Sequence, residues 1–244
     1  MANIDLRLNG NALKLIAALS MLIDHVGYML FPSVTVLRIL GRIAFPIFAF
    51  MVAQGCRYTR NRLRHFLSIF ILGVVMQIVM HIAGEGGVMN IFLTFSLSIL
   101  LIYALDSIKK LIFVKKSGFL VILLCSAGFA LLAAAFCVIA EELHMDYGAF
   151  GCLAPLTASI FFSEDGYPEF MKRLDMLPIH VITMSVCLIW HAVDSGGVQP
   201  YFFLAIPLLM LYSGKRGRLN LKYFFYVFYP AHMVIIYAIK LFLK

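Results

Sequence analysis

Long apolar runs separated by short polar segments dominate the pattern of this chain. Nine of these runs are long enough, or nearly so, to cross the hydrocarbon core of a bilayer, which takes about 20 helical residues. They cover residues 12–31, 37–56, 66–83, 89–108, 118–140, 147–163, 176–193, 199–213 and 223–242. The pattern therefore predicts an all-α, polytopic integral membrane bundle of about nine transmembrane helices.

No sequence repeat, low-complexity stretch or long polar loop interrupts this pattern. We therefore expect a single domain over residues 1–244. Because the N-terminal segment is polar and the first apolar run is long enough to span, we expect that run to be its own insertion signal. Five prolines, at positions 46, 155, 178, 207 and 230, lie inside or at the ends of the runs, where they are expected to kink helices.

Basic residues predict the orientation of the chain. The sequence has 20 Lys and Arg against 12 Asp and Glu, and 16 of those 20 fall in the N-terminal segment and in alternate loops. The remaining loops are acidic or neutral, so the positive-inside rule places the N-terminus in the cytoplasm and the C-terminus outside. Since the positive charge follows membrane topology, we do not expect nucleic-acid binding.

Two pairs of ionisable residues lie inside apolar runs. Asp24 and His25 fall near the middle of the first run, and Arg38 and Arg42 at or within the outer part of the second. A charged residue at the centre of a membrane helix costs roughly 2.5–3.5 kcal/mol, so each is a functional hypothesis. Because Asp24 is rotated by about 100° from His25, we expect it to pair with Arg42 of the neighbouring helix. A purely structural ion pair is the alternative for these two.

Histidine suits proton transfer because its unperturbed pKa is near neutral pH, which favours His25 as a general base. A proton relay in a transporter would use similar residues. Other polar residues occur at similar depth and are candidates to line a cavity with it: His232, Asn90, Thr94, Asp146 and Tyr147.

Two predicted cytoplasmic segments each carry four basic residues. Topology alone explains such charge, and the sharper hypothesis is a site for a multiply charged phosphate ligand. The residues are Arg57, Arg60, Arg62 and Arg64 in one segment, and Lys215, Arg216, Arg218 and Lys222 in the other. The five cysteines have no metal-ligand spacing, so no metal site is expected.

Several segments resemble the TraX family. They are LKLIAALSMLIDHVGYMLFP at 13–32, LRILGRIAFPIFAFMVAQGCRYTRNRLRHF at 37–66, NIFLTFSLSIL at 90–100, DYGAFG at 146–151 and YSGKRGRLNLKYFFYVFYPAHMVII at 212–236. TraX proteins are similar to a wider superfamily of transmembrane acyltransferases. The resemblance implies a multi-pass protein of the bacterial cytoplasmic (inner) membrane that moves an acyl group, most simply acetyl, from cytoplasmic acyl-CoA to an amine or hydroxyl on the far side.

The resemblance also implies roles for the residues. One branch of the superfamily has an Arg eleven residues before a catalytic His in the first helix, and Lys14 and His25 repeat that spacing with Lys in place of Arg. Acetyl-CoA is then the expected cofactor, with Lys14 and the basic segments as phosphate contacts. His25 is expected to act by direct transfer or through an acyl-histidine. Asp24, Arg42 and His232 complete the catalytic set, with Asn90, Thr94, Asp146 and Tyr147 as acceptor contacts.

The sequence leaves the acceptor open. In conjugation a TraX protein acetylates the pilin N-terminus, and a protein N-terminus, a glycan and a lipid all fit an amine or hydroxyl acceptor. Membrane lipid is an expected partner, and an oligomer is compatible with the sequence. Two alternatives stand beside the enzyme. One is a proton- or anion-coupled transporter that uses Asp24, His25, Arg42 and His232, and the other is a catalytically silent membrane partner of another assembly.

Overall fold

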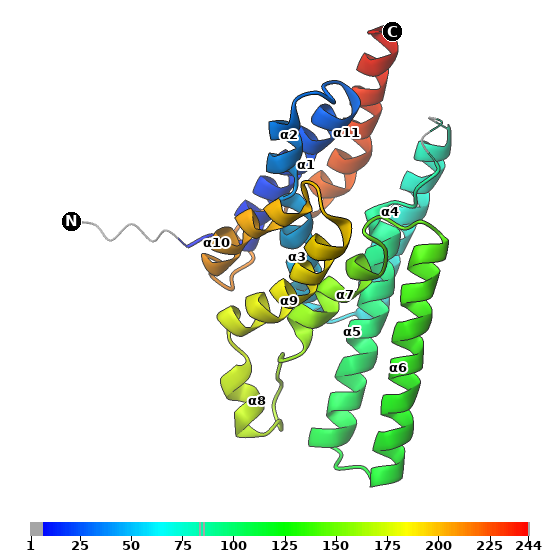
Figure 1. Cartoon of the computed structure of the whole chain (residues 1–244). Helices are drawn as coiled ribbons and strands as arrows, with labels where there is room; N and C mark the ends of the chain where they lie inside the picture. The colour runs from blue at the N-terminus through cyan, green and yellow to red at the C-terminus, as the bar shows by residue number, and fades with distance from the viewer. Residues whose placement is uncertain (1–6, 83, 85, 244) are drawn as a thin grey trace, which may run out of the picture. The chain divides into compact units, whose positions relative to one another are not determined.

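The structure is a computed structural model that describes residues 7–82, 84 and 86–243. Its elements are α1 (Gly10–Met29), α2 (Thr35–Gly41), α3 (Ala44–Tyr58), α4 (Arg62–Ile82), α5 (Ile91–Phe113), α6 (Phe119–Glu142), α7 (Gly148–Ser159), α8 (Glu169–Leu174), α9 (Leu177–Ser195), the 3₁₀ helix η1 (Gln199–Leu204), α10 (Ala205–Met210) and α11 (Lys222–Phe242) (Figure 1). Within these residues, extended pairing is limited to the isolated bridges Leu8–Tyr212 and Met89–Met145. The predicted all-α class is confirmed.

Seven segments are long and apolar enough to span a membrane. They are Gly10–Met29, Thr35–Tyr58, Arg62–Ile82, Ile91–Phe113, Phe119–Glu142, Leu177–Ser195 and Tyr223–Phe242. They match seven of the nine predicted runs, and the other two contain only the shorter helices Gly148–Ser159 and Gln199–Met210. Twelve residues of α-helix rise about 18 Å, which is less than the ~30 Å of a bilayer core. The chain is a multi-pass membrane protein, and its described residues contain seven segments that are long and apolar enough to cross the bilayer.

The second span is broken in its N-terminal half. α2 ends at Gly41 and α3 begins at Ala44, so Arg42 and Ile43 lie in a turn between them. Pro46 explains the break, because it has no N–H for the carbonyl four residues earlier, and its ring collides with that carbonyl. That carbonyl belongs to Arg42. The break therefore places Arg42 at a helix end.

The chain forms two compact units. The first contains residues up to Met51 and from Leu188 onward, and the second contains Val52–Cys187, so α3 and α9 pass from one unit to the other. In the first unit, α1 packs against α2 and α11; in the second, α5 packs against α4, α6 and α7 (Figure 1). The prediction of one domain stays a prediction.

Contacts at the helix ends agree with the predicted topology. In the first unit, the N–H groups of Gly10 and Asn11 donate to the carbonyls of Lys215 and Arg216, at 2.7 and 3.0 Å. In the second unit, the N–H of Met89 donates to the carbonyl of His144 at 3.1 Å. Each contact joins segments that the positive-inside rule places on one side. The absolute orientation stays a prediction.

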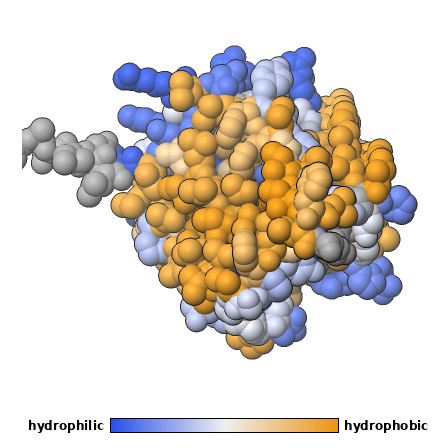
Figure 2. Space-filling view, turned by 90° about the horizontal axis from the view of Figure 1, so that it is seen from above, coloured by the Kyte–Doolittle hydropathy of each residue, from blue (hydrophilic) through white to orange (hydrophobic). Residues whose placement is uncertain are grey.

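Much apolar surface is exposed. Leu124 and Leu131 of α6 are 63% and 73% exposed, and Figure 2 shows hydrophobic residues over much of the face that it presents. Contiguous apolar surface of this extent is unfavourable in water. It fits helices that face lipid.

Candidate functional site

One carboxylate joins α1 to α2 in the first unit. Arg42 donates through Nη2 to both Oδ1 and Oδ2 of Asp24, at 2.6 Å each. Arg38 donates through Nη1 to Oδ2 of the same carboxylate, also at 2.6 Å. Asp24 and Arg42 are 8% and 4% exposed. The predicted Asp24–Arg42 pair is present, and Arg38, which sequence reasoning had not paired, shares it.

Two small residues allow α1 and α2 to approach this closely. A Cβ on Gly41 would overlap the Asp24 carboxylate, and Ser20 donates through Oγ to the carbonyl of Leu40. Sequence reasoning missed Gly41, although it directly precedes Arg42 in the motif GRIAFP. Its missing side chain makes room for the ion cluster.

His25 meets His232 of α11 in the same unit. Nδ1 of His25 lies 2.8 Å from Nε2 of His232, and the rings stack at 5.0 Å between centroids with an interplanar angle of 23°. Nδ1 of His232 lies 2.8 Å from the carbonyl oxygen of Phe228, one turn earlier. Two of the four predicted catalytic residues are thus in direct contact.

These hydrogen bonds assign the proton positions. A carbonyl can only accept, so Nδ1 of His232 carries its proton and donates it to Phe228. Nε2 of neutral His232 is then an acceptor, and Nδ1 of His25 must donate to it. The lone pair of His25 is therefore on Nε2, which has no hydrogen bond to any described residue. This assignment gives His25 a nitrogen that can accept a proton.

Aromatic residues fix the orientation of the two imidazoles. Phe228 stacks on His232 at 5.1 Å with an angle of 17°. Tyr229 lies edge-on to His25 at 6.4 Å and to His232 at 5.3 Å. All three α11 residues come from the sequence FYPAH, so one helical turn supplies the whole support.

The other end of α1 adjoins a basic loop. Lys215, Arg216 and Arg218 are exposed, and Lys14 is close enough to Arg216 to interact with it electrostatically. The side chain of Lys222 lies outside the described part of the chain. Gly217 has a φ of +99° and would bring a Cβ within 2.7 Å of Oδ1 of Asn9, so glycine is required there. Eleven residues separate Lys14 from His25, or about 16 Å along the helix.

The basic segment with Arg57, Arg60, Arg62 and Arg64 is half paired within its own unit. Arg57 donates from Nη1 and Nη2 to the two carboxylate oxygens of Asp175, at 2.7 Å each, and Arg62 pairs with Asp106. Arg60 and Arg64 are exposed and make no ion pair with described residues. Two of the four expected phosphate contacts thus have a protein carboxylate as partner.

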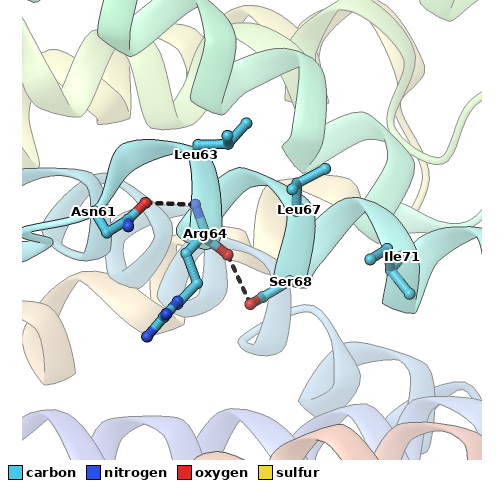
Figure 3. Close-up of a pocket in the computed structure, with 6 residues that line it drawn as sticks. All are labelled: Asn61, Leu63, Arg64, Leu67, Ser68 and Ile71. Atoms are coloured by element: carbon cyan, nitrogen blue, oxygen red, sulfur yellow. Dashed lines mark hydrogen bonds between the residues drawn. The ribbon is translucent and has the colours of Figure 1, made fainter.

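The groove in Figure 3 lies along the start of α4. It is lined by Asn61, Leu63, Arg64, Leu67, Ser68 and Ile71. The Arg64 side chain extends away from the helix, while Ser68 bonds back to the Arg64 carbonyl at 2.7 Å. The groove contains none of the predicted catalytic residues, and its lining residues are half polar and half apolar.

Asp175 is the centre of a hydrogen-bonded cluster in the second unit, in which both of its carboxylate oxygens have partners. Besides Arg57, it accepts from the N–H and Oγ of Ser163 at 3.0 and 2.8 Å, and from Nε2 of His180 at 2.9 Å. Burial alone would raise the pKa of this carboxyl. The bonds from His180, Arg57 and Ser163 outweigh burial and hold the pKa below its usual value.

The four predicted acceptor contacts lie together in the second unit. Asn90 caps α5 and donates through Nδ2 to the carbonyl of Gly73 and to Gln77, at 2.8 and 3.0 Å. Thr94, which is fully buried, donates to the carbonyl of Asp146 at 3.1 Å, and Tyr147 has a φ of +62° before α7. Protein partners therefore occupy the polar atoms of Asn90 and Thr94, and an acceptor role for the four stays a prediction.

Comparison with known proteins places these residues in a family. The sequence profile of the TraX protein family matches residues 9–240. A probable fimbrial assembly protein of Dichelobacter nodosus, FimC of serogroup H1, is 24% identical over 248 residues, which cover 95% of this chain and 96% of that protein. An uncharacterised protein of Rickettsia prowazekii (strain Madrid E) is 42% identical over 66 residues, 27% of this chain and 25% of that protein. No solved structure matches.

Proposed function

The chain belongs to the TraX family, and from that membership we propose that it is a membrane acetyltransferase with acetyl-CoA as donor. The observation that carries the proposal is the His25–His232 pair within the membrane spans, because it directs a lone pair of His25 away from its partner. A histidine serving only as a link between helices needs no such orientation.

His25 acts on the acceptor as a general base. Its Nε2 takes the proton of an amine or hydroxyl while that group attacks the thioester carbonyl of acetyl-CoA, so the new C–N or C–O bond forms and the C–S bond breaks. The CoA thiolate leaves and recovers the proton from His25. In the alternative route, Nε2 itself attacks and carries the acetyl group as an acyl-histidine. Both routes use the same lone pair.

His232 and the ion cluster support the base. The hydrogen bond from Nδ1 of His25 to His232 shares the positive charge that develops when Nε2 is protonated. Arg42, held by Asp24, supplies positive charge that favours the thioester oxyanion, directly or through a neighbouring donor. The same ion pair holds α1 and α2 in register around His25.

The basic loop beside α1 is the proposed site for the CoA phosphates. Lys14, Lys215, Arg216 and Arg218 gather charge at that end of α1, from which the pantetheine arm would extend along the helix towards His25. Lys222 follows in the sequence and is a further candidate. Arg57 and Arg62 are weaker choices because each already has a carboxylate partner. The printed name of the Dichelobacter relative suggests that the acceptor belongs to a surface fibre.

Equilibrium binding tests the donor. Titration of the purified protein in detergent with acetyl-CoA should show saturable binding, and Lys215→Gln with Arg216→Gln should weaken it at least about tenfold, because charge-assisted hydrogen bonds contribute about 1.5–3 kcal/mol each. The control, Lys115→Gln with Lys116→Gln, removes the same charge from another exposed loop and should change affinity less than about twofold. Equal losses in the two variants, or no binding to the folded wild type, would contradict the proposal.

A further inference from the structure

Arg38 uses only part of its guanidinium within the protein. Its Nη1 bonds to Oδ2 and the carbonyl of Asp24, at 2.6 and 3.4 Å. Its Nε and Nη2 have no hydrogen-bond partner among the described residues. The Arg38 side chain is 25% exposed, whereas that of Arg42 is 5% exposed. Arg38 therefore has donors that an incoming group can reach.

The charge of the cluster favours an anion as that group. Asp24 supplies one negative charge to two guanidiniums, so the three groups together carry a formal charge of +1. A guanidinium in apolar surroundings binds carboxylate or phosphate through two parallel N–H bonds. Arg38 shares the Asp24 carboxylate with Arg42 and bonds to it through one nitrogen only, so it can still form such a pair with another anion.

Arg38 lies close to the proposed base. Its Cζ is 5.0 Å from the ring centroid of Tyr28, which is three residues after His25 and on the same face of α1, about 5 Å further along the axis. The close approach of α1 and α2 at this point depends on Gly27, since a Cβ there would lie 2.6 Å from Cβ of Leu37. The ring that Arg38 contacts therefore lies about one helical turn from His25 along α1.

We propose that Arg38, backed by Tyr28, binds the acceptor through a carboxylate or phosphate that lies a few bonds from the amine or hydroxyl to be acetylated. The inference rests on the proposed acetyltransferase function and adds the acceptor class. The proposed contacts of the donor lie at the other end of α1. Lys14 is fourteen residues, or about 21 Å along the helix, from Tyr28, so the anion at Arg38 belongs to the acceptor. Arg38 acts as a specificity-determining residue, while the proton goes to His25.

A lipid headgroup phosphate offers the same chemistry. Arginines near a membrane surface commonly extend to lipid phosphates, and Tyr28 is 63% exposed. In that case Arg38 would anchor the protein and make no distinction between acceptors. The test therefore varies acceptor and lipid separately.

Matched acceptors test the proposal. Phosphoethanolamine and ethanolamine differ by one phosphate on the same amine, and acetyl transfer to each is measured from acetyl-CoA in phosphatidylcholine nanodiscs with and without phosphatidylglycerol. Wild type should prefer phosphoethanolamine by at least about tenfold in kcat/KM, the effect of one charge-assisted hydrogen bond pair. Arg38→Gln should reduce the ratio of the two rates to about one, and Arg38→Lys should give an intermediate ratio because it keeps the charge without the fork. Lys240→Gln removes one positive charge that is predicted on the same side of the membrane as Arg38, and it should keep the wild-type ratio of the two rates.

Several results would overturn the inference. They are equal rates for the two acceptors, a preference that survives Arg38→Gln, and no transfer to phosphoethanolamine by protein that binds acetyl-CoA. A lipid role is indicated instead if phosphatidylglycerol raises the Tm of wild type but not of Arg38→Gln while no acceptor preference exists. Failure of the proposed function gives a different result, since acetyl-CoA would neither bind nor be consumed with any acceptor.

Discussion

The two units contain similar ionisable residues, but the histidine of each unit has a different hydrogen-bond partner and a different exposure. Each has an aspartate paired with arginine and a nearby histidine. In the second unit, Asp175 accepts from Arg57, Ser163 and His180, and His180 is 2% exposed, with the Phe162 ring edge-on at 4.7 Å. In the first unit, His25 turns to His232 instead of to Asp24 and remains partly exposed.

The difference separates a structural cluster from a chemical one. Nε2 of His180 is bound to a carboxylate and its Nδ1 is buried without a hydrogen bond to a described residue, so an acceptor group cannot reach either nitrogen. His25 uses one nitrogen for orientation and keeps the other for a reactant. Ionisable residues in a membrane are thus informative only together with their remaining hydrogen-bonding capacity.

The largest expected effect comes from removing the two histidines in turn. His25→Ala should lower acetyl transfer by about 10²–10⁴-fold while the protein stays folded, because a general base is lost. His180→Ala should instead destabilise the second unit by about 2 kcal/mol, through a cavity and the loss of one hydrogen bond to the Asp175 carboxylate, with transfer retained below its Tm. CoA release and thermal unfolding measure both. Comparable activity losses from the two folded variants would remove the distinction between the clusters.

The close approach of α1 and α2 gives the next effect. Gly41→Ala places a Cβ on the Asp24 carboxylate and should destabilise the first unit by about 1–3 kcal/mol. Gly128→Ala in α6 is the control, since no described residue beyond the surrounding helix backbone lies within 4 Å of the added Cβ, and alanine favours a helix. Hydrogen exchange of α1 and α2 peptides should rise only in the first variant. Unchanged exchange in Gly41→Ala would show that the ion cluster tolerates the added group.

The orientation of His25 predicts a smaller effect at His232. His232→Ala removes the acceptor for the Nδ1 proton of His25 and should lower kcat about tenfold, with a shifted pH profile and little change in the KM for acetyl-CoA. His232→Gln keeps an acceptor oxygen and should restore part of the rate. If Gln and Ala lower kcat equally, His232 contributes packing and not a hydrogen bond.

The smallest expected effect is a change with pH in how much Asp175 stabilises the second unit, and it should appear only in acid. Because the folded state holds the pKa of Asp175 below its usual value of about 3.9, its pairing stabilises the unit above that pH and is lost as the pH falls further. The difference in Tm between wild type and Asp175→Asn should therefore be full at neutral pH and shrink below about pH 4. Asp165→Asn, an exposed residue of the same segment, should give little difference at any pH. A constant difference for Asp175→Asn would contradict the charge-based account.

Helix periodicity and depth were sufficient to predict part of the site from the sequence. The rotation of Asp24 away from His25 predicted its pairing with Arg42, which the structure contains. The sharing of Asp24 with Arg38, and the carboxylate partners of Arg57 and Arg62, depend on which helices pack together. One sequence does not contain that information.

Two of the apolar runs are longer than the helices that they contain. The run at 147–163 includes Tyr147, with positive φ before α7, and the turn after Ser159, so only twelve of its residues are in the helix. The run at 199–213 begins as 3₁₀ helix and continues as the short α10. Apolar loop residues count towards a hydropathy window in the same way as helical ones, which explains why these runs are longer than their helices.

The most direct test of the acetyltransferase is acetyl transfer across a sealed membrane. Proteoliposomes are loaded with acetyl-CoA at the face that carries Lys215 and Arg216, and phosphoethanolamine is supplied at the opposite face. We expect free CoA on the first side and acetylated amine on the second in equal amounts, both dependent on His25. Proton or anion flux through folded wild type without release of CoA would contradict it and would indicate a transporter.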